Sequence, residues 1–363
     1  MTVKFLIWLT LILAIFGLVM ISSAGVYLSQ KNFGADYYYF NHQFLFGFLP
    51  GLILFLIASR IDYRIWKRFS FVLIFLSLGL LALIFVPGFG ITIGGAKRWV
   101  NFFGFFSFQP AEILKLTLII YLASWLQQFG KSKTGSVAAF IIILFSVGVF
   151  IAAQPDIGTL GIIISIAILM FFTAGGKFKQ LFGIIILIVV SFSLLTVFSD
   201  YRFDRFLVFI NPNFDVQDKG YHLNQSLITI GKGGFLGTGF GKGEQKLGFL
   251  PEPVGDSIFA VIGEELGFVG MIFLLALFLL FIFLSFIIAK KTNDKFASLY
   301  AIGLASWVGI QSFVNIASLS GIVPLTGVPL PFISYGGTSL AVLMTGVGIL
   351  VNIAKNTGQR IRT

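Results

Sequence analysis

Residues 244–267 read EQKLGFLPEPVGDSIFAVIGEELG, and this stretch joins a hydrophilic segment to a long apolar one. Four of its carboxylates, on Glu252, Asp256, Glu264 and Glu265, follow one another closely. An ionisable side chain at membrane depth costs roughly 2.5–3.5 kcal/mol on insertion scales, so such a residue indicates a functional site. The stretch therefore predicts a site at the edge of a membrane.

The composition excludes a soluble globular domain, because 57% of the 363 residues are hydrophobic and 11% are charged. Apolar runs of about 18 or more residues indicate helical membrane spans. The alternating segments of about 10 residues that outer-membrane barrels show are absent from the sequence. We therefore predict an all-α polytopic membrane protein with a single domain over residues 1–363. The ten predicted spans lie at about residues 4–29, 41–59, 69–87, 109–127, 137–153, 157–173, 181–198, 258–289, 297–318 and 332–354.

The basic residues predict the orientation of these spans. With ten spans, the loops on the side of the N-terminus hold 15 of the 25 Lys and Arg residues and two acids. Cytoplasmic loops carry such an excess, so both termini are expected in the cytoplasm. The break at residues 154–156 separates two spans, and merging them would reverse the orientation of everything that follows. This assignment leaves one large extracellular loop, residues 199–257, between helices 7 and 8, and it explains the net charge of +11 without nucleic acid. The first apolar segment is too long for a signal-peptide core and is expected to be retained.

Asp256 is the strongest candidate for chemistry. It stands just before a predicted helix, where Asp is also a favoured N-cap, so a capping role and a catalytic role both fit. Glu252 and Glu264 are near enough in the sequence to raise its proton affinity or to recruit a divalent cation. A general base needs a carboxylate of tunable pKa that faces water. With no Cys and two distant His residues, His42 and His222, no thiolate or His-based metal site is expected.

Further charged residues lie in or beside the apolar segments. Glu112 and Lys115 are spaced i, i+3 on one predicted helix, so they form a structural ion pair or hold a ligand. Arg98, beside Trp99, anchors the chain at the interface or recognises phosphate with its guanidinium. Asp156 caps the helix that follows it or serves the site.

Two segments are rich in helix-breaking residues. Residues 231–243, GKGGFLGTGFGKG, hold seven glycines and match no nucleotide-binding motif. This segment is a flexible surface loop, or its backbone N–H groups approach an anionic ligand with the help of Lys242 and Lys246. Residues 320–340, SGIVPLTGVPLPFISYGGTSL, predict an irregular segment that dips toward the membrane, which is tolerated only when buried in protein or lining a cavity.

Five motifs, taken together, resemble the SEDS family of cell-wall polymerases, the FtsW/RodA/SpoVE group. The resemblance covers nearly the whole chain, and GTGFGKGEQKLGFLPE is more similar to FtsW and SpoVE than to RodA. The chain departs from the family at Val254-Gly255, where His-Thr is common, at Ser257, where Phe is common, and at Ala111, where Ser is common. The motifs are GAKRWVNFF with FQPAEILKL, QPDIGT, YRFDRFLVFINP with GYHLNQSLITIGKGGFLGTGFGKGEQKLGFLPE, DSIFAVIGEELG, and PLTGVPLPFISYGGTSL.

The resemblance implies a ten-helix peptidoglycan glycosyltransferase of the bacterial cytoplasmic membrane. Such an enzyme polymerises lipid II into undecaprenyl-pyrophosphate-linked glycan on the outer face and works with a class B penicillin-binding protein. The family's catalytic aspartate falls on Asp256, which we expect to act as the general base. Mg²⁺ or another divalent cation is an alternative to basic side chains for neutralising the pyrophosphate. The expected substrate-binding residues are Arg98, Glu112, Lys115, Asp156, Lys242, Lys246 and Glu252.

Two other functions remain open from the sequence. A lipid II flippase or another membrane transporter would also use embedded charges such as Glu112, Lys115 and Asp156. Transport needs gates at both faces, whereas the acids of this chain gather at the outer side. A scaffold that activates its penicillin-binding partner is the third function.

Overall fold

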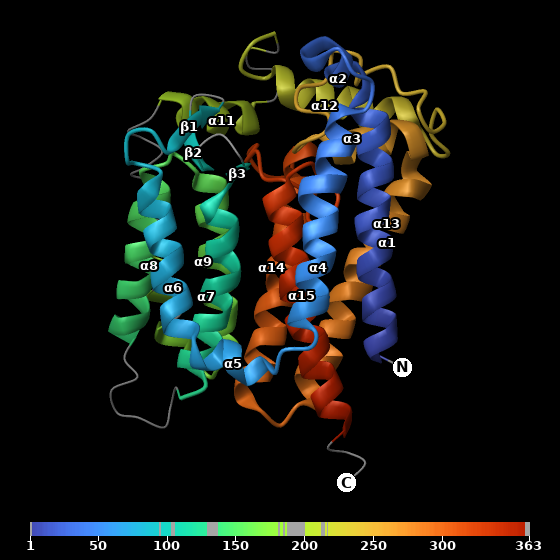
Figure 1. Ribbon diagram of the computed structural model, residues 1–363. Helices are drawn as coiled ribbons and strands as arrows, with labels where there is room; N and C mark the ends of the chain where they lie inside the picture. Colours follow the sequence, from blue (N-terminus) through green and yellow to red (C-terminus); the bar gives the residue numbers. More distant parts are fainter. Residues whose placement is uncertain are drawn as a thin grey trace.

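The apolar segments of the sequence form helices that stand side by side in the computed structural model (Figure 1). The structure describes residues 2–93, 96–102, 106–128, 137–180, 182–183, 186, 200–211, 215 and 217–359. The first residues of α1 and the last of α15 lie at the same end of the bundle (Figure 1). The helices are α1 (Thr2–Ala24), α2 (Val26–Phe33), α3 (Tyr38–Gln43), the π-helical turn η1 (Phe44–Phe48), α4 (Leu49–Ala58), α5 (Tyr63–Arg68), α6 (Ser70–Leu83), α7 (Pro110–Leu126), α8 (Val137–Ala152), α9 (Ile157–Thr173), α11 (Asp200–Ile210), α12 (Tyr221–Gly233), α13 (Ile258–Lys291), α14 (Lys295–Leu319) and α15 (Gly337–Gln359).

Nine of the ten predicted spans coincide with helices in the described residues, and the remaining one, 181–198, lies mostly outside them. Five helices are long and apolar enough to cross a membrane by length and composition. The break at residues 154–156 is confirmed, because α8 ends at Ala152 and α9 begins at Ile157. The chain is therefore a mostly helical membrane protein, and the count of ten spans stays a prediction.

The prediction of an all-α chain was wrong, because residues 90–93, 96–102 and 106–108 form a small antiparallel sheet. Its order is β1-β2-β3, with Gly90 opposite Val100 and Val100 opposite Phe108. β-branched and aromatic residues pack well on a pleated surface, and they dominate this segment. The strands are β1 (Gly90–Ile93), β2 (Ala96–Phe102) and β3 (Phe106–Phe108).

The predicted span 258–289 contains a kink near its start. Gly267, inside α13, has φ 66° and ψ −166°, a backbone conformation that is almost exclusive to glycine. A Cβ atom at this position would lie 2.3 Å from Gly237 N, so the glycine also allows close approach of the loop after α12. The kink separates a short first piece of α13, which carries Glu264 and Glu265, from the long apolar piece.

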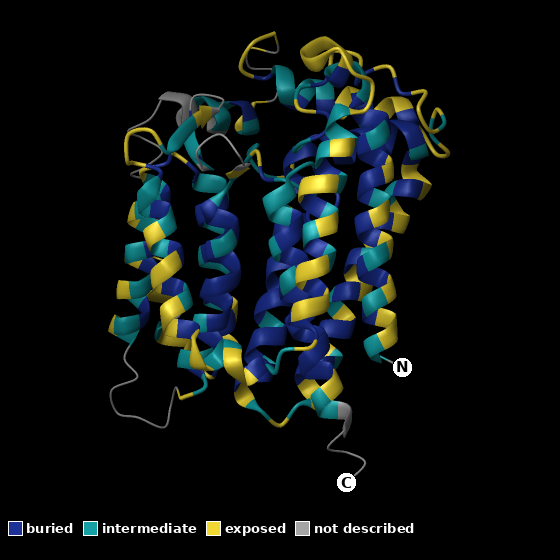
Figure 2. Cartoon of the chain, viewed as in Figure 1, coloured by how far each residue is buried: buried dark blue, intermediate teal, exposed yellow. Residues whose placement is uncertain are grey.

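α14 lies at the centre of the bundle, in contact with α7, α9, α13 and α15. Three of its four aromatic side chains, on Phe296, Tyr300 and Trp307, are fully buried. The outward faces of the surrounding helices are exposed (Figure 2). Many of the exposed side chains there are large and apolar, such as Phe145, which is 70% exposed. Large apolar side chains on the outside of a helical bundle are those expected to face lipid.

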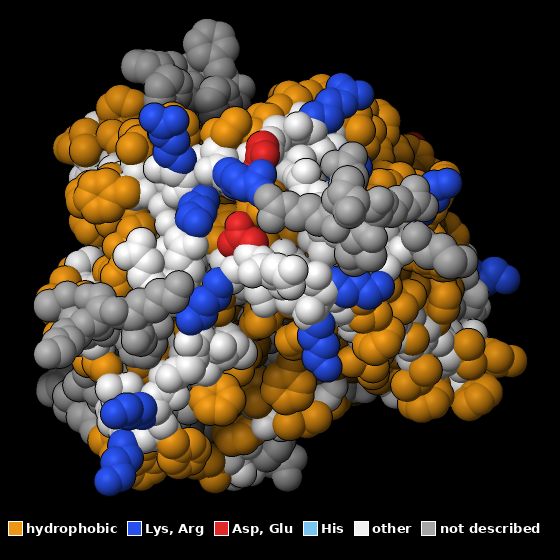
Figure 3. All heavy atoms as spheres, turned by 90° about the horizontal axis from the view of Figure 1, so that it is seen from below, with side chains coloured by type: hydrophobic (Ala, Val, Ile, Leu, Met, Phe, Trp, Pro, Cys, Tyr) orange, Lys and Arg blue, Asp and Glu red, His pale blue; other side chains and the backbone are white. Residues whose placement is uncertain are grey.

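The end of the bundle that holds the termini is basic. Seen from that end, Lys and Arg side chains are spread across the face, and apolar side chains form much of its rim (Figure 3). The basic residues include Lys67 and Arg68 in the last turn of α5, and Lys290 and Lys291 in the last turn of α13.

Residues 320–336, between α14 and α15, contain no helix or strand and are named here the re-entrant segment. Val328, Leu330 and Phe332 of this segment are buried against the helices. The segment packs against α1 so closely that a Cβ atom on Gly17 would lie 2.5 Å from the Phe332 carbonyl oxygen. The prediction of an irregular segment buried in protein is therefore confirmed.

Replacing Gly267 by Ala is expected to lower the free energy of unfolding by about 1–3 kcal/mol or more, because Ala is strained at this φ and ψ and meets Gly237. Thermal unfolding of the purified protein in detergent measures the loss. Gly79→Ala in α6 is the matched control, since no atom lies within 4 Å of its added Cβ and Ala favours a helix. Equal melting temperatures for the two variants would contradict the assigned conformation of Gly267.

Candidate active site

Asp256 lies two residues before α13, at the end of the bundle opposite the termini (Figure 1). The capping role that the sequence allowed is wrong, because Ser257 holds the N-cap position of α13. Asp256 is half-buried, and its Oδ1 atom is buried without a hydrogen-bond partner among the described residues. A buried acceptor left unpaired is costly, which marks Asp256 as a functional group more than a structural one.

The surroundings of Asp256 adjust its proton affinity. Burial raises the pKa of Asp256 to about 6, and the positive charge of Arg205 opposes that rise. Desolvation disfavours the charged carboxylate, and a nearby cation favours it. Glu252 belongs to the same region, since desolvation and then the Asp256 charge raise its pKa. Asp256 is thus mostly ionised at pH 7 yet close to its titration range, which suits a general base.

Hydrogen bonds from two elements hold the backbone around Asp256. Asn315 of α14 donates through Nδ2 to the carbonyl oxygens of Asp256, at 2.7 Å, and Val328, at 2.8 Å. The re-entrant segment contributes Ser334, whose hydroxyl donates to the Gly255 carbonyl oxygen at 2.6 Å. The candidate base is therefore attached both to the central helix and to the re-entrant segment.

Glu112 and Lys115 form the ion pair that their spacing predicted. Lys115 Nζ lies 2.8 Å from Glu112 Oε1, and both side chains are almost fully buried. The ammonium also donates to Gln311 Oε1 of α14 at 2.8 Å and lies 4.9 Å from the centre of the Trp307 ring. Gln311 Nε2 in turn donates to the Pro329 carbonyl oxygen at 2.8 Å. The pair is thus connected through α14 to the re-entrant segment.

Arg98 and Asp156 lie together at the start of α9. Arg98 donates to the Pro155 carbonyl oxygen at 2.8 Å, and its Nε lies 3.8 Å from Asp156 Oδ2. Asp156 caps α9 by accepting from the Thr159 backbone N–H at 3.3 Å and from its hydroxyl at 2.9 Å. The capping interpretation of Asp156 is confirmed, while the side chain of Arg98 stays 31% exposed and able to meet a ligand.

Lys246 is buried and forms an ion pair with Glu265. Its ammonium also donates to Ser23 Oγ at 2.6 Å and to the Gly241 carbonyl oxygen at 3.2 Å. Ser23 belongs to α1, so this cluster ties α1, the glycine-rich loop and the first piece of α13 together. Lys246 therefore has a structural environment, and its predicted contact with substrate has no support from the geometry.

Glu264 anchors the same loop by a different route. Its carboxylate accepts the backbone N–H groups of Glu244 at 3.0 Å and Gln245 at 3.2 Å, and its carbonyl oxygen accepts that of Thr238 at 2.9 Å. Lys242 of the loop remains exposed. Glu264 and Glu265 thus serve the loop and do not combine with Asp256. Among the described residues, no three His, Cys, Asp or Glu side chains gather as a metal site.

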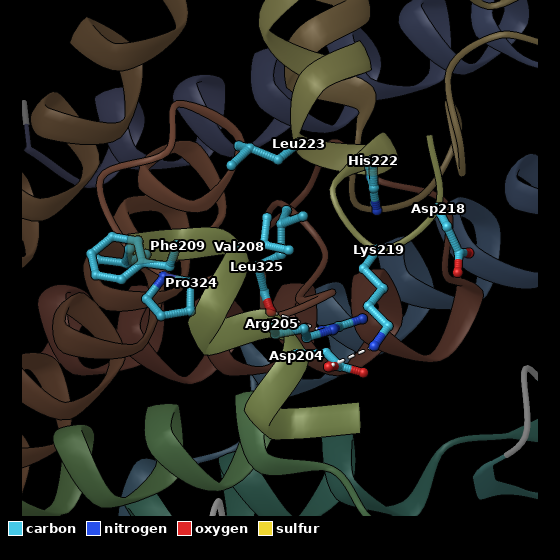
Figure 4. A pocket seen from close by; sticks show the side chains of 11 residues that line it. Asp204, Arg205, Val208, Phe209, Asp218, Lys219, His222, Leu223, Pro324 and Leu325 are labelled. Atoms are coloured by element: carbon cyan, nitrogen blue, oxygen red, sulfur yellow. Dashed lines mark hydrogen bonds and ion pairs between the residues drawn. The ribbon is translucent and has the colours of Figure 1, made fainter. Parts of the chain in front are cut away.

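A cavity of about 270 Å³ opens between α11, the start of α12 and the re-entrant segment (Figure 4). Arg205 and Lys219 supply positive charge to its lining, and Asp204 and Asp218 supply negative charge. Lys219 Nζ pairs with Asp204 Oδ1 at 2.9 Å, and Arg205 donates to the Leu325 carbonyl oxygen at 2.8 Å. The lining of this cavity is polar on one side and apolar on the other (Figure 4).

His222 joins this cavity to the segment of Asp256. Its Nε2 lies 2.7 Å from the Ser257 hydroxyl, and burial, then the charge of Arg205, lowers the pKa of His222 to about 4. The imidazole is therefore neutral at pH 7. Neither Arg205 nor His222 was predicted as a site residue from the sequence. Both stand in motifs that carry the family resemblance, YRFDRFLVFINP and GYHLNQSLITIGKGG, but their approach to Asp256 and Ser257 depends on the tertiary fold.

Replacing Lys115 by Met is expected to cost about 3–5 kcal/mol of stability, because it leaves the Glu112 carboxylate buried without its cation. Thermal unfolding in detergent measures the effect. Lys232→Met is the matched control, since the pair of Lys232 with Glu244 spans 3.6 Å and is exposed, and such pairs contribute about 0–1 kcal/mol. If the two variants unfold at the same temperature, the buried pair does not hold α7 against α14.

A family model, named relatives and solved structures each match nearly the whole chain. The family model FTSW_RODA_SPOVE, described as Cell cycle protein, matches residues 4–359. A relative from Geobacter sp. (strain M18), named "Probable peptidoglycan glycosyltransferase FtsW", is 36% identical over 95% of both chains, and stage V sporulation protein E of Bacillus subtilis (strain 168) is 35% identical over 96% of both. The structure described as "Structural coordination of polymerization and crosslinking by a peptidoglycan synthase complex" contains a chain that matches with a TM-score of 0.81 and 26% identity over 98% of both chains. The rod shape determining protein RodA of Thermus thermophilus matches with a TM-score of 0.71 and 26% identity, covering 97% of this chain and 96% of RodA.

Proposed function

Because the chain belongs to the FtsW/RodA/SpoVE family of cell cycle proteins, we propose that it is a peptidoglycan glycosyltransferase that polymerises lipid II, with Asp256 as its general base. Relatives that carry this activity in their names support the reaction. The observation that carries the assignment of the base is the half-buried carboxylate of Asp256, with a pKa of about 6 and an unpaired Oδ1. Desolvation and then the charge of Asp256 raise the pKa of Glu252, so the two carboxyl groups share one electrostatic environment.

The reaction joins two sugars. The acceptor hydroxyl oxygen attacks the anomeric carbon of the donor, and the bond from that carbon to the pyrophosphate oxygen breaks. Asp256 takes the hydroxyl proton, and the electron pair of the broken bond leaves on the pyrophosphate. A positioned base of this kind contributes about 10²–10⁴ in rate.

The leaving pyrophosphate needs positive charge as it departs. Arg98, still partly exposed, and Lys242, on the surface of the glycine-rich loop, are the basic residues that we propose for this role. Mg²⁺ or another divalent cation stays a proposed companion of the pyrophosphate. Mg²⁺ is commonly held by one or two carboxylates together with substrate phosphates, and the exposed Glu252 fits that pattern.

We place the enzyme in the bacterial cytoplasmic membrane with ten spans, both termini inside and Asp256 at the outer face. The basic end that holds the termini supports this orientation, because cytoplasmic loops carry an excess of Lys and Arg (Figure 3). A class B penicillin-binding protein is the proposed partner, and the similarity to a chain from a peptidoglycan synthase complex supports it.

A flippase or another transporter is less well supported. Glu112 and Lys115, the embedded charges that such a pathway would use, are each 2% exposed and paired with each other, and Lys115 also donates to Gln311. The cavity near Asp256 is lined by α11 and the start of α12, and both helices lie at one end of the bundle (Figure 1). Chemistry at one face needs such an arrangement, whereas transport needs a pathway through both faces.

Asp256→Asn is expected to reduce polymerisation about 10²–10⁴-fold, because the amide cannot accept the proton. The measurement is the formation of glycan from labelled lipid II by the purified protein in detergent, where transport across a bilayer cannot produce polymer. Parallel reactions with a chelator and with added Mg²⁺ test the cation.

Glu244→Gln is the control for this variant, since its side chain is 76% exposed at the same end of the molecule and should leave the rate unchanged. A folded Asp256→Asn protein that polymerises at the wild-type rate would remove Asp256 from the role of base.

The rate should also depend on pH through this carboxylate. Because the pKa of Asp256 is raised to about 6, the ionised form is lost earlier on acidification than for an ordinary Asp. We expect kcat/KM to fall about tenfold for each pH unit below the pKa and to level off above it. Initial rates in buffers on both sides of the pKa measure this limb, and a flat profile over that range contradicts a titrating base.

A further inference from the structure

The cavity beside Asp256 combines hydrogen-bonding groups of both kinds. The carboxylates of Asp204 and Asp218 can only accept hydrogen bonds, and the cations of Arg205 and Lys219 can only donate them. A hydroxyl group both donates and accepts, so it can satisfy either kind of partner. A phosphate oxygen at neutral pH mainly accepts, so half of this polar lining would oppose it.

The charge of the cavity also favours an uncharged ligand that carries hydroxyl groups over a phosphate. Two carboxylates balance two cations, and His222 is neutral at pH 7 because its pKa is lowered to about 4. Lys219 is already paired with Asp204. A pyrophosphate would gain little net attraction and would meet the repulsion of both acids. An uncharged polar ligand avoids that repulsion.

The apolar side chains of the lining are grouped on one side of the cavity. Phe209 and Pro324 lie on one side of the cavity and Leu223 above them, away from Lys219 and Asp218 (Figure 4). A sugar ring presents C–H groups on its faces and hydroxyl groups at its edge, so it matches a cavity with one apolar side and one polar side. Ligand sites commonly combine apolar walls with a few polar groups that fix orientation.

The position of the cavity connects it to the reaction. His222 lines the cavity and its Nε2 lies 2.7 Å from the Ser257 hydroxyl, next to Asp256 in the chain. Arg205 also lines it and is close enough to Asp256 to lower its pKa. The cavity therefore adjoins the segment of the proposed base through His222 and Arg205.

We propose that this cavity binds the sugar ring of the acceptor, whose hydroxyl group Asp256 deprotonates. The inference rests on the proposed glycosyl transfer and adds to it the saccharide site. The volume of about 270 Å³ is at the lower end of ligand pockets, which span roughly 300–1,000 Å³, so it fits one ring and leaves the next sugar outside.

Two variants and two probes test the proposal. The probes are the soluble disaccharide of the glycan, which carries neither lipid nor phosphate, and inorganic pyrophosphate. Leu223→Trp fills the cavity, and Leu227→Trp places the same ring one turn later on α12, at a position 41% exposed. We expect the disaccharide to inhibit polymerisation by the wild-type protein and by Leu227→Trp, and to lose its effect on Leu223→Trp.

Asp218→Asn is expected to change inhibition in opposite directions for a sugar site and for a phosphate site. Asp218 is exposed, so the fold tolerates the change. For a sugar site, loss of the charged acceptor should weaken inhibition by the disaccharide about tenfold or more. For a phosphate site, loss of the negative charge should strengthen inhibition by pyrophosphate. Tighter pyrophosphate inhibition with unchanged disaccharide inhibition would overturn the proposal, as would equal disaccharide inhibition of both Trp variants.

The same disaccharide titrated calorimetrically into the wild-type and variant proteins keeps this inference distinct from the proposed function. Binding that Leu223→Trp abolishes and Leu227→Trp retains supports the saccharide site without any turnover. Failure of the wild-type protein to polymerise lipid II overturns the proposed function. Polymerisation by the wild-type protein, with disaccharide binding that both Trp variants retain, overturns the saccharide site alone.

Discussion

The buried ion pair of Glu112 and Lys115 determines how the centre of this protein is assembled. Two charges removed from water are stable only when each finds enough partners, and breaking such a pair is far more costly than breaking an exposed one. Lys115 finds a carboxylate on its own helix and the amide oxygen of Gln311 on α14. The ammonium of Lys115 needs both partners, and this need fixes the position of α7 relative to α14. The side chains of α14 are therefore placed relative to α7 as well.

Two amide side chains of α14 connect this helix to the re-entrant segment and to the backbone of Asp256. Gln311 and Asn315 stand four residues apart on α14 and so share one face. Their amide groups donate to the adjacent carbonyl oxygens of Pro329 and Val328, and the second hydrogen of Asn315 Nδ2 goes to the Asp256 carbonyl oxygen. A functional group held by a rigid helix is placed more accurately than one held by a loop. This explains how a segment without regular structure can present the carboxylate that we propose as the base.

Local patterns in the sequence predicted the features that depend on local physics. Apolar runs gave the helices, the i, i+3 spacing gave the Glu112–Lys115 pair, and the residue type and position of Asp156 gave its cap. The features that these local patterns did not predict depend on contacts between distant segments. Lys246 resembled a free cation, because its partners Glu265 and Ser23 lie 19 and 223 residues away. The sheet of residues 90–108 was missed because its aromatic residues equally suit a membrane interface.

The same distinction applies to Asp256, the proposed general base, because the sequence reveals its carboxylate but not its pKa. A base must be partly removed from water to have a pKa near neutrality, yet it must remain accessible to its substrate. Desolvation alone would raise the pKa of Asp256 further, and the charge of Arg205, on α11, limits the rise to about 6. Arg205 also lines the cavity next to the base, so the group that restrains the pKa of Asp256 also belongs to the wall that a substrate would meet. Substrate binding and proton affinity are consequently coupled through one guanidinium, because any ligand that shifts Arg205 also changes the charge that Asp256 experiences.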